Sequence, residues 1–370
     1  MTVRQNILIP DGDSTWALSV IQCLAQVKKY NIFVLSNKKR TATKFSKYTS
    51  YYQFYERPDD SGWVDIINSE IEKNAISVVL PIAEQEILFT IKNKDEISSL
   101  AKIIPLPGLK DFEIAIDKNK LSEFSRSHGI PHPNSFFIAS ETDKQEVLSQ
   151  IQFPILIKPL DLKGGDGIKK INSEEKFQKY LKKANHPILV QEYIEGYDID
   201  CSVLCLDGKV LSHTIQKGNL KGHSAFAPQL AFDFLQNDEV LDVAKLTMFK
   251  LNWSGIAHLD LRYDAKTKDY KLIEINARFW GSIEGSMFAG INFPHNVIQL
   301  ALNQELVDDD YKAIHHMRFK GVLKTIKRNP LFVFRRKYLM NNTEARSFFK
   351  DPLPTLYKFR EWLGRRFDSI

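Results

Sequence analysis

Residues 255–279, GIAHLDLRYDAKTKDYKLIEINARF, predict two short strands, Gly255–Tyr263 and Tyr270–Phe279, joined by the turn DAKTKD. Because strand side chains alternate between two faces, each strand has one apolar face and one face on which polar groups recur. The polar face of the first strand comprises Ile256, His258, Asp260 and Arg262. That of the second comprises Tyr270, Leu272, Glu274, Asn276 and Arg278. Pairing of the strands would bring Asp260, Glu274 and Asn276 together.

The oxygens of these three side chains suit Mg²⁺, which usually keeps waters and substrate phosphates as its remaining ligands. A solvated sheet face would show the same alternation. Such a face more often carries Lys, Thr and Glu than a Glu-x-Asn-x-Arg run bounded by apolar residues. The strand pair alone therefore leaves a metal site and a solvated face equally open.

A second signal is the stretch FPILIKPLDLKGGDGI at residues 153–168. A buried type of strand ends at Lys158, and a loop containing Gly164, Gly165 and Gly167 leads into the next strand. Glycine backbone can approach phosphate oxygens closely, and the lysine supplies a point charge for the same phosphates. The stretch is not a Walker A loop, because no Gly-Lys-Ser/Thr opens a helix. Taken alone, it favours a flexible hairpin tip.

Two weaker signals lie on either side of this loop. LVQEYIEGYDID at residues 189–200 predicts two strands and a connector that can offer backbone groups to an adenine edge and a carboxylate to ribose hydroxyls. DKNKL at residues 117–121 begins a predicted helix. Taken singly, an interdomain linker and an exposed first helical turn are the preferred interpretations.

The rest of the pattern predicts two kinds of sheet. Strand and helix signals alternate up to residue 92, which predicts a parallel, doubly wound α/β sheet. No GxGxxG follows the first predicted strand, so no sequence motif supports a dinucleotide-binding site there. From about residue 121, short strands divided by turns predict antiparallel sheet with flanking helices, an α+β arrangement.

The order and spacing of these stretches resemble the ATP-grasp superfamily over roughly residues 1–300. The matching segments are DKNKL at 117–121, FPILIKP-x₄-GGDG at 153–167, VQEYIEGYD at 190–198, HLDLR at 258–262 and EINARFWGS at 274–282. The branch most similar is that of the carboxylate–amine ligases, with an ATP-binding fold like that of D-alanine–D-alanine ligase and carbamoyl-phosphate synthetase. The resemblance implies a Rossmann-like domain at 1–110, a small ATP-grasp subdomain with a glycine-rich flap at 111–188, a large subdomain with the metal site at 189–318, and a basic helical extension at 319–370. ATP would lie between two antiparallel sheets.

The resemblance also implies a role for individual residues. Lys118 and Lys158 would bind ATP phosphates beneath a flap formed by Gly164, Gly165 and Gly167. The adenine slot would be lined by Gln191, Glu192, Tyr193 and Ile194, and Asp198 would take the ribose position, where the family more often has Glu. The ligands of two Mg²⁺ ions, with Mn²⁺ as an alternative, would be Asp260, Glu274 and Asn276. Arg278 would stabilise the transferring phosphate or an acyl-phosphate, and His258 stands where several relatives have Arg.

What the resemblance implies is ATP-dependent ligation of a small-molecule carboxylate to an amine, with release of ADP and phosphate. Positioning and charge neutralisation would perform most of this chemistry. Two alternatives stay open: another ATP-grasp reaction such as carboxylation through carboxyphosphate, and a non-catalytic nucleotide-binding or membrane-surface protein. Dimers are frequent among relatives, so a homodimer also stays open.

Two segments are candidates for contacting the substrates. The loop KGNLKGHSAFAPQ at 217–229 offers Lys221 and His223 to a carboxylate or phosphate, and an exposed loop without a role explains it equally well. Glu84 and Glu86 follow the predicted strand SVVLP, where they could contact an acceptor amine. An acidic pair at a helix N-terminus is the simpler interpretation.

Composition places the chain among soluble globular proteins. Its 370 residues are 43% hydrophobic and 26% charged, and no stretch approaches the ~20 apolar residues of a membrane-spanning helix. The three cysteines, Cys23, Cys201 and Cys205, cannot form a disulfide framework, and we expect reduced thiols in a cytoplasmic protein, with Cys201 and Cys205 in the core.

The net charge of +6 is unevenly distributed. Residues 320–370 contain 13 Lys+Arg and 4 Asp+Glu, which gives +9 there and −3 for the rest of the chain. A helix predicted at Thr355–Phe367 has an apolar arc flanked by Arg360 and Arg366, with Lys358 and Arg365 opposite; the arc comprises Leu356, Phe359, Leu363 and Phe367. Packing of this arc on the body is the preferred interpretation, and contact with anionic lipid is the alternative. Nucleic acid ranks lower, because no nucleic-acid motif accompanies the charge.

Overall fold

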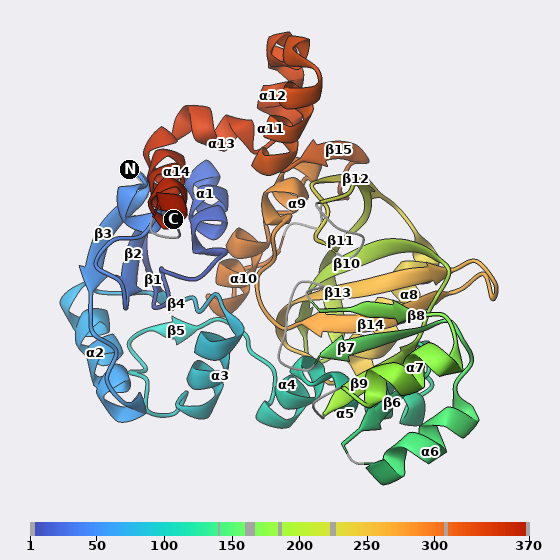
Figure 1. Ribbon diagram of the computed structural model, residues 1–370. Helices are drawn as coiled ribbons and strands as arrows, with labels where there is room; N and C mark the ends of the chain where they lie inside the picture. The colour runs from blue at the N-terminus through green and yellow to red at the C-terminus, as the bar shows by residue number, and fades with distance from the viewer. Residues whose placement is uncertain are drawn as a thin grey trace.

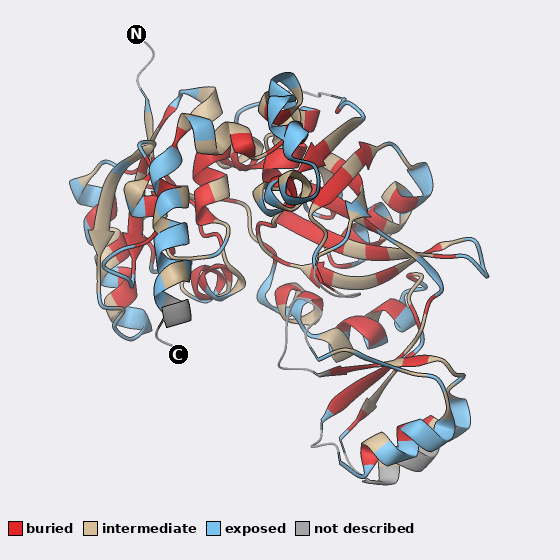
Figure 2. Cartoon of the chain, turned by 45° about the horizontal axis from the view of Figure 1, so that its top comes forward, coloured by how far each residue is buried: buried red, intermediate tan, exposed pale blue. Residues whose placement is uncertain are grey.

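The computed structural model describes residues 4–139, 141–159, 167–183, 187–222, 227–306 and 310–367. This part of the chain forms three sheets with helices packed around them (Figure 1). Buried residues concentrate on the strands and on the helix faces turned toward the sheets (Figure 2). Among the described residues, none of the helices is both long and apolar enough to cross a membrane.

The N-terminal sheet is parallel and has the strand order β3-β2-β1-β4-β5. Its strands are β1 (Gln5–Ile9), β2 (Tyr30–Ser36), β3 (Thr49–Phe54), β4 (Val78–Val79) and β5 (Lys102–Ile103). The connecting helices are α1 (Ala17–Val27), the 3₁₀ turn η1 (Thr43–Phe45), α2 (Asp60–Lys73) and α3 (Glu84–Lys92). The predicted parallel α/β sheet is confirmed. The strand order reverses between β1 and β4, and such a switch point opens a crevice at the carboxyl ends of the strands.

The apolar run of β1 is explained by burial on both faces of this sheet. Ile7 and Ile9 pack into one hydrophobic cluster and Leu8 into another on the opposite face. The first cluster continues through α1 into two helices from far along the chain, α9 (Ile283–Ala289) and α10 (Phe293–Ala301). The parallel sheet is therefore joined by a shared core to the C-terminal half of the chain.

A four-stranded sheet of order β6-β9-β7-β8 lies at the other end of the molecule (Figure 1). Its strands are β6 (Ser135–Ile138), β7 (Ile155–Pro159), β8 (Lys169–Ile171) and β9 (Ile188–Glu192). The helices of this region are α4 (Leu109–Ile116), α5 (Lys118–Ser127), α6 (Glu141–Gln150) and α7 (Glu174–Leu181). Because β9 pairs with β6 and β7, a subdomain boundary at residue 188 would separate this strand from its sheet. The connector after Glu192 is the boundary that sheet pairing favours.

The third sheet is antiparallel, with the order β14-β13-β10-β11-β12-β15. Its strands are β10 (Gly196–Leu206), β11 (Lys209–Leu220), β12 (Ala231–Leu235), β13 (Gly255–Asp264), β14 (Tyr270–Asn276) and β15 (Ile314–Met317), and α8 (Asp238–Lys250) packs on it. Cys201 and Cys205 are fully buried in its core, as predicted.

A β-bulge in β14 corrects the predicted alternation of that strand. Asp260 pairs with Glu274, whereas Leu261 pairs with Leu272, so Ile273 is an extra residue. One extra residue exchanges the two faces of a strand. Tyr270 and Leu272 therefore lie in the hydrophobic core, whereas Glu274 and Asn276 share the polar face with Asp260.

The basic extension folds back across the molecule to the N-terminal sheet (Figure 1). It consists of α11 (Phe319–Arg328), the 3₁₀ turn η2 (Pro330–Phe334), α12 (Arg336–Asn342), α13 (Ala345–Lys350) and α14 (Pro352–Phe367). Asp351, 1% exposed, accepts hydrogen bonds from the Ser46 hydroxyl (2.5 Å) and the Lys47 amide (3.2 Å). This contact anchors the start of α14 beside η1.

The packing of α14 corrects the preferred interpretation of its apolar arc. Tyr357 stacks on Phe45 with ring centroids 4.7 Å apart, and its hydroxyl donates to the Arg40 carbonyl. Leu356 and Phe359 lie on the other side of the helix and are 51% and 57% exposed. The helix thus packs through its tyrosine side, whereas Leu356 and Phe359 of the arc are exposed and Leu363 is half-buried.

Candidate active site

The polar face of the antiparallel sheet brings the three predicted metal ligands together. The cross-strand pairs Asp260–Glu274 and His258–Asn276 are adjacent on β13 and β14. The Asn276 amide nitrogen lies 3.3 Å from Asp260 Oδ1. Partial burial, followed by repulsion from Glu274 and Asp200, raises the pKa of Asp260 above its usual range. The site therefore concentrates negative charge that an additional cation would relieve.

Asp200 on β10 adds a further carboxylate to the three predicted metal ligands, and it was not predicted from the sequence. It pairs directly with Asp260 across the strands. Ligand atoms of Asp200, His258 and Asp260 all lie within 4.8 Å of one another. Burial raises the pKa of Asp200 to about 7, a rise limited by the hydrogen bond from Gln216. The signal available in sequence was its two-residue spacing from Asp198, which places both side chains on one face of β10.

His258 is held as a neutral side chain at the edge of the acidic group. Its ring stacks on Trp280 at a centroid distance of 5.4 Å, and its Nδ1 lies 2.8 Å from the Ser202 hydroxyl. Burial and the nearby Arg278 guanidinium lower the pKa of His258 to about 3. A neutral imidazole whose Nε2 lies 3.3 Å from Asp260 can contact a ligand without repelling a cation.

The donor set fits a divalent metal of the magnesium type. Carboxylate and amide oxygens are hard ligands, and the crowding of Asp200, Asp260 and Glu274 is the arrangement that such an ion stabilises. Asn276 is oriented by Arg278, whose Nη2 donates to the amide oxygen at 2.6 Å. Asp260, Glu274 and Asn276 would hold the ion, and their role as ligands remains a prediction.

Lys158 approaches this face from the four-stranded sheet. It lies near the end of β7, is 6% exposed, and lines a cavity of about 10 Å³ together with Lys118 and Gln191. Burial lowers the pKa of Lys158 to about 8, an effect that attraction to Glu274 opposes and repulsion from Lys118 reinforces. Leu272 and the bulged Ile273 line the same cavity. Lys158 from β7 and Lys118 from the start of α5 thus line one small cavity with two residues of β14, and Lys158 is close enough to Glu274 to be attracted to it.

The connector between the two antiparallel sheets is held by a network of hydrogen bonds. Gln191 is buried and donates to Ser135, and the Glu192 carboxylate accepts from the Asn134 amide. Lys170 lies over the Tyr193 ring, 3.4 Å from its centroid. Ile194 is 3% exposed. Gln191 lines the same cavity as Lys158, and the chain continues from it along β7 toward Pro154. The adenine slot assigned to these four residues remains a prediction.

Arg262 fastens this connector to β13 and was not singled out from sequence. Its guanidinium donates to the carbonyls of Ile194 (2.7 Å) and Gly196 (3.0 Å) and forms an ion pair with Asp198. Asp198, expected at the ribose, is therefore already paired on its exposed side chain. A guanidinium fork can satisfy three acceptors at once, which an ammonium group cannot do with this geometry.

We expect Arg262→Lys to weaken ATP binding about tenfold, because the connector would lose two of its three ties. Calorimetric titration with ATP measures this change without knowledge of the other substrates. Arg346→Lys, which alters an arginine of the C-terminal extension, is the matched control. Equal ATP affinity in Arg262→Lys and the unaltered protein would contradict a role of this arginine in ordering the connector.

Arg278 connects the metal strands with the N-terminal sheet. Its Nε lies 3.3 Å from the Glu84 carboxylate at the start of α3, directly after β4. Trp16, at the start of α1 after β1, lies between two guanidinium groups, with Arg278 5.8 Å and Arg318 5.5 Å from its ring centroid. Two cations from the antiparallel half of the chain thus lie at the switch point between β1 and β4.

The remaining predicted residues divide into several groups. Glu86 is a structural residue, since its buried carboxylate accepts from Trp63 Nε1 (2.8 Å) and pairs with Arg57. Gly167 has a φ of 73°, a left-handed conformation that favours glycine. The carbonyl of the exposed Lys221 accepts from Lys324 Nζ at 2.8 Å. Gly164, Gly165 and His223 lie outside the described residues.

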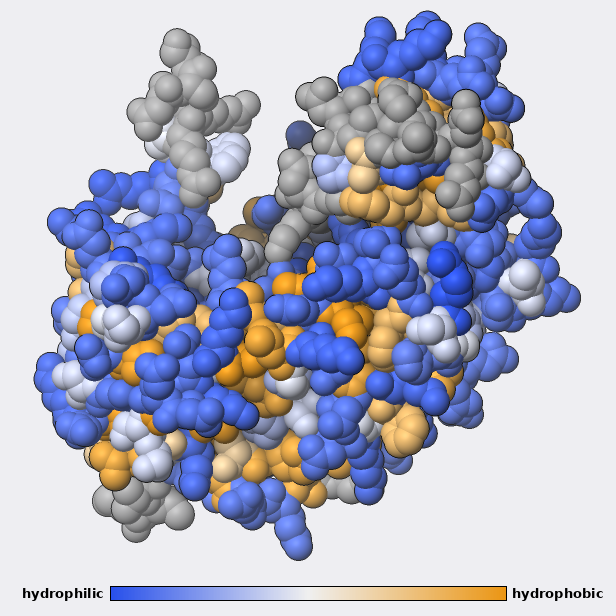
Figure 3. Space-filling model, turned by 90° about the horizontal axis from the view of Figure 1, so that it is seen from below, coloured by the Kyte–Doolittle hydropathy of each residue, from blue (hydrophilic) through white to orange (hydrophobic). Residues whose placement is uncertain are grey.

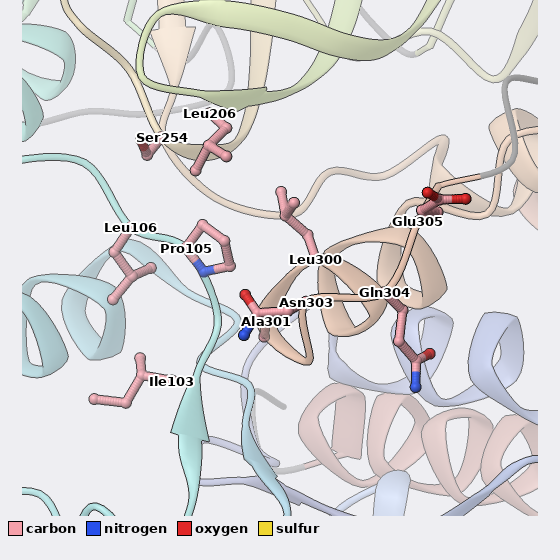
Figure 4. A pocket seen from close by; sticks show the side chains of 10 residues that line it. All are labelled: Ile103, Pro105, Leu106, Leu206, Ser254, Leu300, Ala301, Asn303, Gln304 and Glu305. Atoms are coloured by element: carbon pink, nitrogen blue, oxygen red, sulfur yellow. The ribbon is translucent and has the colours of Figure 1, made fainter.

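A larger pocket of about 560 Å³ lies away from these groups (Figure 4). It is formed by the segment after β5, the β10–β11 turn and the end of α10, and the figure shows Leu206, Pro105 and Leu300 turned toward it. Among the described residues that line it, Glu305 alone is acidic or basic, whereas several charged groups converge at the candidate site. Seen from below, the surface is mostly hydrophilic, with hydrophobic side chains gathered near its centre (Figure 3).

Comparison with known proteins agrees with this arrangement. Residues 119–242 match the family model "Prokaryotic glutathione synthetase, ATP-grasp domain", and residues 184–324 match "ATP-grasp in the biosynthetic pathway with Ter operon". The carbamoyl phosphate synthase large chain of Methanocorpusculum labreanum is 25% identical over 273 residues, which are 70% of this chain and 25% of that one. The chain therefore spans about a quarter of the length of this relative.

Solved structures show the same fold at low identity. N5-carboxyaminoimidazole synthetase from Staphylococcus aureus has a TM-score of 0.69 at 13% identity, covering 89% of this chain and 87% of its own. L-amino acid ligase from Bacillus licheniformis has a TM-score of 0.58 at 17% identity, covering 81% and 74%. Two overlapping models thus assign residues 119–324 to the ATP-grasp superfamily, and the solved structures share the fold of the chain.

Proposed function

We propose that this protein is an ATP-dependent ligase that joins a carboxylate to an amine. The observation that carries the proposal is the grouping of Asp260, Glu274 and Asn276 on one sheet face. Arg278 is hydrogen-bonded to Asn276, and Lys158 is close enough to Glu274 to be attracted to it. Such a set combines cations with metal-binding oxygens, which is what stabilisation of phosphoryl transfer requires. The neighbouring residues that contact these five side chains hold them in position.

In this proposal each element of the site has one task. The strip from Gln191 to Ile194 holds the adenine, and Lys118 and Lys158 bind the phosphates. Asp260, Glu274 and Asn276 would hold Mg²⁺, which supplies charge neutralisation at the phosphates when bound. We assign two ions to the site, and Mn²⁺ as a substitute for Mg²⁺.

The reaction proceeds by two displacements. An oxygen of the substrate carboxylate attacks the γ-phosphorus of ATP and ADP leaves, which yields an acyl-phosphate. The amine nitrogen then attacks the acyl carbon, inorganic phosphate leaves, and the nitrogen loses a proton. In this scheme Arg278 neutralises charge on the transferred phosphoryl group, and Glu84, its ion-pair partner at the start of α3, contacts the amine. Both substrates are small molecules in this scheme.

A second candidate is phosphorylation of bicarbonate to carboxyphosphate. It is supported by the resemblance to the carbamoyl phosphate synthase large chain and to structures described as carboxylases and carboxyaminoimidazole synthetases. The same metal and lysine groups would serve this reaction. The two reactions differ in that ligation requires a binding site for a carboxylic acid, whereas carboxylation requires one for bicarbonate.

A screen of paired carboxylic acids and amines, followed by ADP release and mass spectrometry of products, tests the proposal. We expect ADP and phosphate in equal amounts with an amide product, and only when both partners are present. ADP release that requires bicarbonate and no carboxylic acid would replace ligation by carboxylation. ATP binding without turnover across a broad screen would favour a non-catalytic nucleotide-binding module.

A further inference from the structure

The turn η2 exposes apolar side chains at the far end of the C-terminal projection. Leu331, Val333 and Phe334 are 71%, 49% and 79% exposed, whereas Phe332 between them is 6% exposed. Phe332 packs against Tyr338 with ring centroids 5.7 Å apart, inside a small hydrophobic cluster of the extension. The turn is therefore folded on its own core and presents the other three side chains outward.

The geometry of a 3₁₀ turn gathers two of these side chains. Three residues complete one turn, so Leu331 and Phe334 lie on the same side of η2. Figure 1 shows that α11 and α12, which η2 joins, stand out above the rest of the molecule. The apolar tip is thus carried on a projection that can reach a broad surface without obstruction by the main body.

Cations surround the same tip. Exposed basic residues precede and follow η2 in the sequence KRNPLFVFRRK, residues 327–337; they are Lys327, Arg328, Arg335, Arg336 and Lys337. Residues 311–343 contain no Asp or Glu. None of the ion pairs formed within the described parts of the chain involves these five cations. They are available to an external anionic partner.

We propose that this tip, residues 327–337, binds the surface of an anionic lipid bilayer. Apolar side chains bordered by Lys and Arg are the composition of segments that insert into the headgroup region. Each cation near an anionic leaflet adds attraction that salt screens. A flat bilayer matches a protruding tip of three apolar side chains, and the charges are complementary. The proposal is independent of the ligase reaction, because no residue of the tip contributes to the candidate active site.

Sedimentation of the full chain with phosphatidylcholine vesicles, with or without phosphatidylglycerol at equal molar share, tests this proposal. We expect binding only with phosphatidylglycerol and a loss of binding at high salt. The double variant Leu331→Ser/Phe334→Ser should bind at least about tenfold more weakly, because it removes the two apolar groups that share a side. Its melting temperature and ATP affinity should remain unchanged, since both side chains contact solvent.

The matched control is Leu100→Ser/Phe249→Ser. These residues are 70% and 67% exposed, so the substitution removes the same types of side chain at similar exposure, away from the basic tip. We expect the control to bind vesicles as tightly as the unaltered protein. Residues of α14 were not chosen for the control, because that helix also exposes apolar side chains. Equal binding by both double variants, or equal binding to neutral vesicles, would overturn the proposal. Self-association that the tip variant abolishes, without vesicle binding, would assign the surface to a second copy of the chain instead.

Discussion

We expect replacement of Glu274 by glutamine to lower Mg²⁺-dependent ADP formation by about a hundred- to a thousandfold. Glu274 lies opposite Asp260 on paired strands and raises the pKa of that residue, so its charge acts at the centre of the acidic group. Glutamine preserves the shape of the side chain and removes the negative charge that holds a divalent ion. The rate of ADP release with the substrates found by screening measures the effect.

A second measurement separates metal binding from general damage. Mn²⁺ bound in the presence of ADP, counted by electron paramagnetic resonance, should decrease in Glu274→Gln and should also report whether one or two ions bind. Glu72→Gln, at an exposed glutamate of α2, is the matched control and should behave as the unaltered protein. Unchanged turnover and Mn²⁺ binding in Glu274→Gln would place the metal elsewhere and would contradict the assignment of Glu274 as a metal ligand.

This acidic group could be predicted from the sequence because its residues lie on two strands that follow each other in the chain. Alternation along β13 and β14 predicted which face of each strand carries Asp260, Glu274 and Asn276. Pairing of the two strands then brings the three side chains together. The bulge at Ile273 could not be predicted, because a bulge is specified by the partner strand as well as by the strand that carries it. Its effect was to move Tyr270 and Leu272 from the predicted polar face into the core.

Residues that act through distant partners were harder to find. Asp200 and Arg262 join the site through pairing of β10 with β13, strands that are more than fifty positions apart in sequence. The side on which α14 packs depends on Phe45 and Arg40 at the opposite end of the chain. Amphipathic spacing alone showed an apolar arc, but it contained no information on which side of the helix the protein covers.

We expect Lys158→Met to weaken ATP binding about a hundredfold and to stabilise the protein without nucleotide. Lys158 is almost fully buried, and its pKa is lowered to about 8 chiefly by burial, so the folded state holds an ammonium group at a cost. The shift from 10.5 to about 8 corresponds to roughly 3 kcal/mol at pH 7. Methionine has a similar length and carries no charge, so it removes this cost and also removes the attraction for phosphate.

The pH dependence has a defined sign. Because the unfolded state binds this proton more tightly than the folded state, stability of the unaltered protein should rise between pH 8 and pH 10.5 relative to Lys158→Met. ATP affinity should change in the opposite direction and fall above about pH 8, where the folded protein without nucleotide loses the ammonium charge. Urea unfolding and ATP titration across this range measure the two changes.

These opposing effects distinguish a functional lysine from a structural one. If Lys158 stabilised the fold through Glu274, methionine would lower the free energy of unfolding and would affect ATP binding only through loss of structure. A gain in stability together with a loss of affinity can arise only if the charge is retained for a ligand that the protein without nucleotide lacks. Lys110→Met, at an exposed lysine of α4, should leave both quantities unchanged and serves as the control. A decrease in stability in Lys158→Met would therefore contradict the assignment of this residue to the phosphates of ATP.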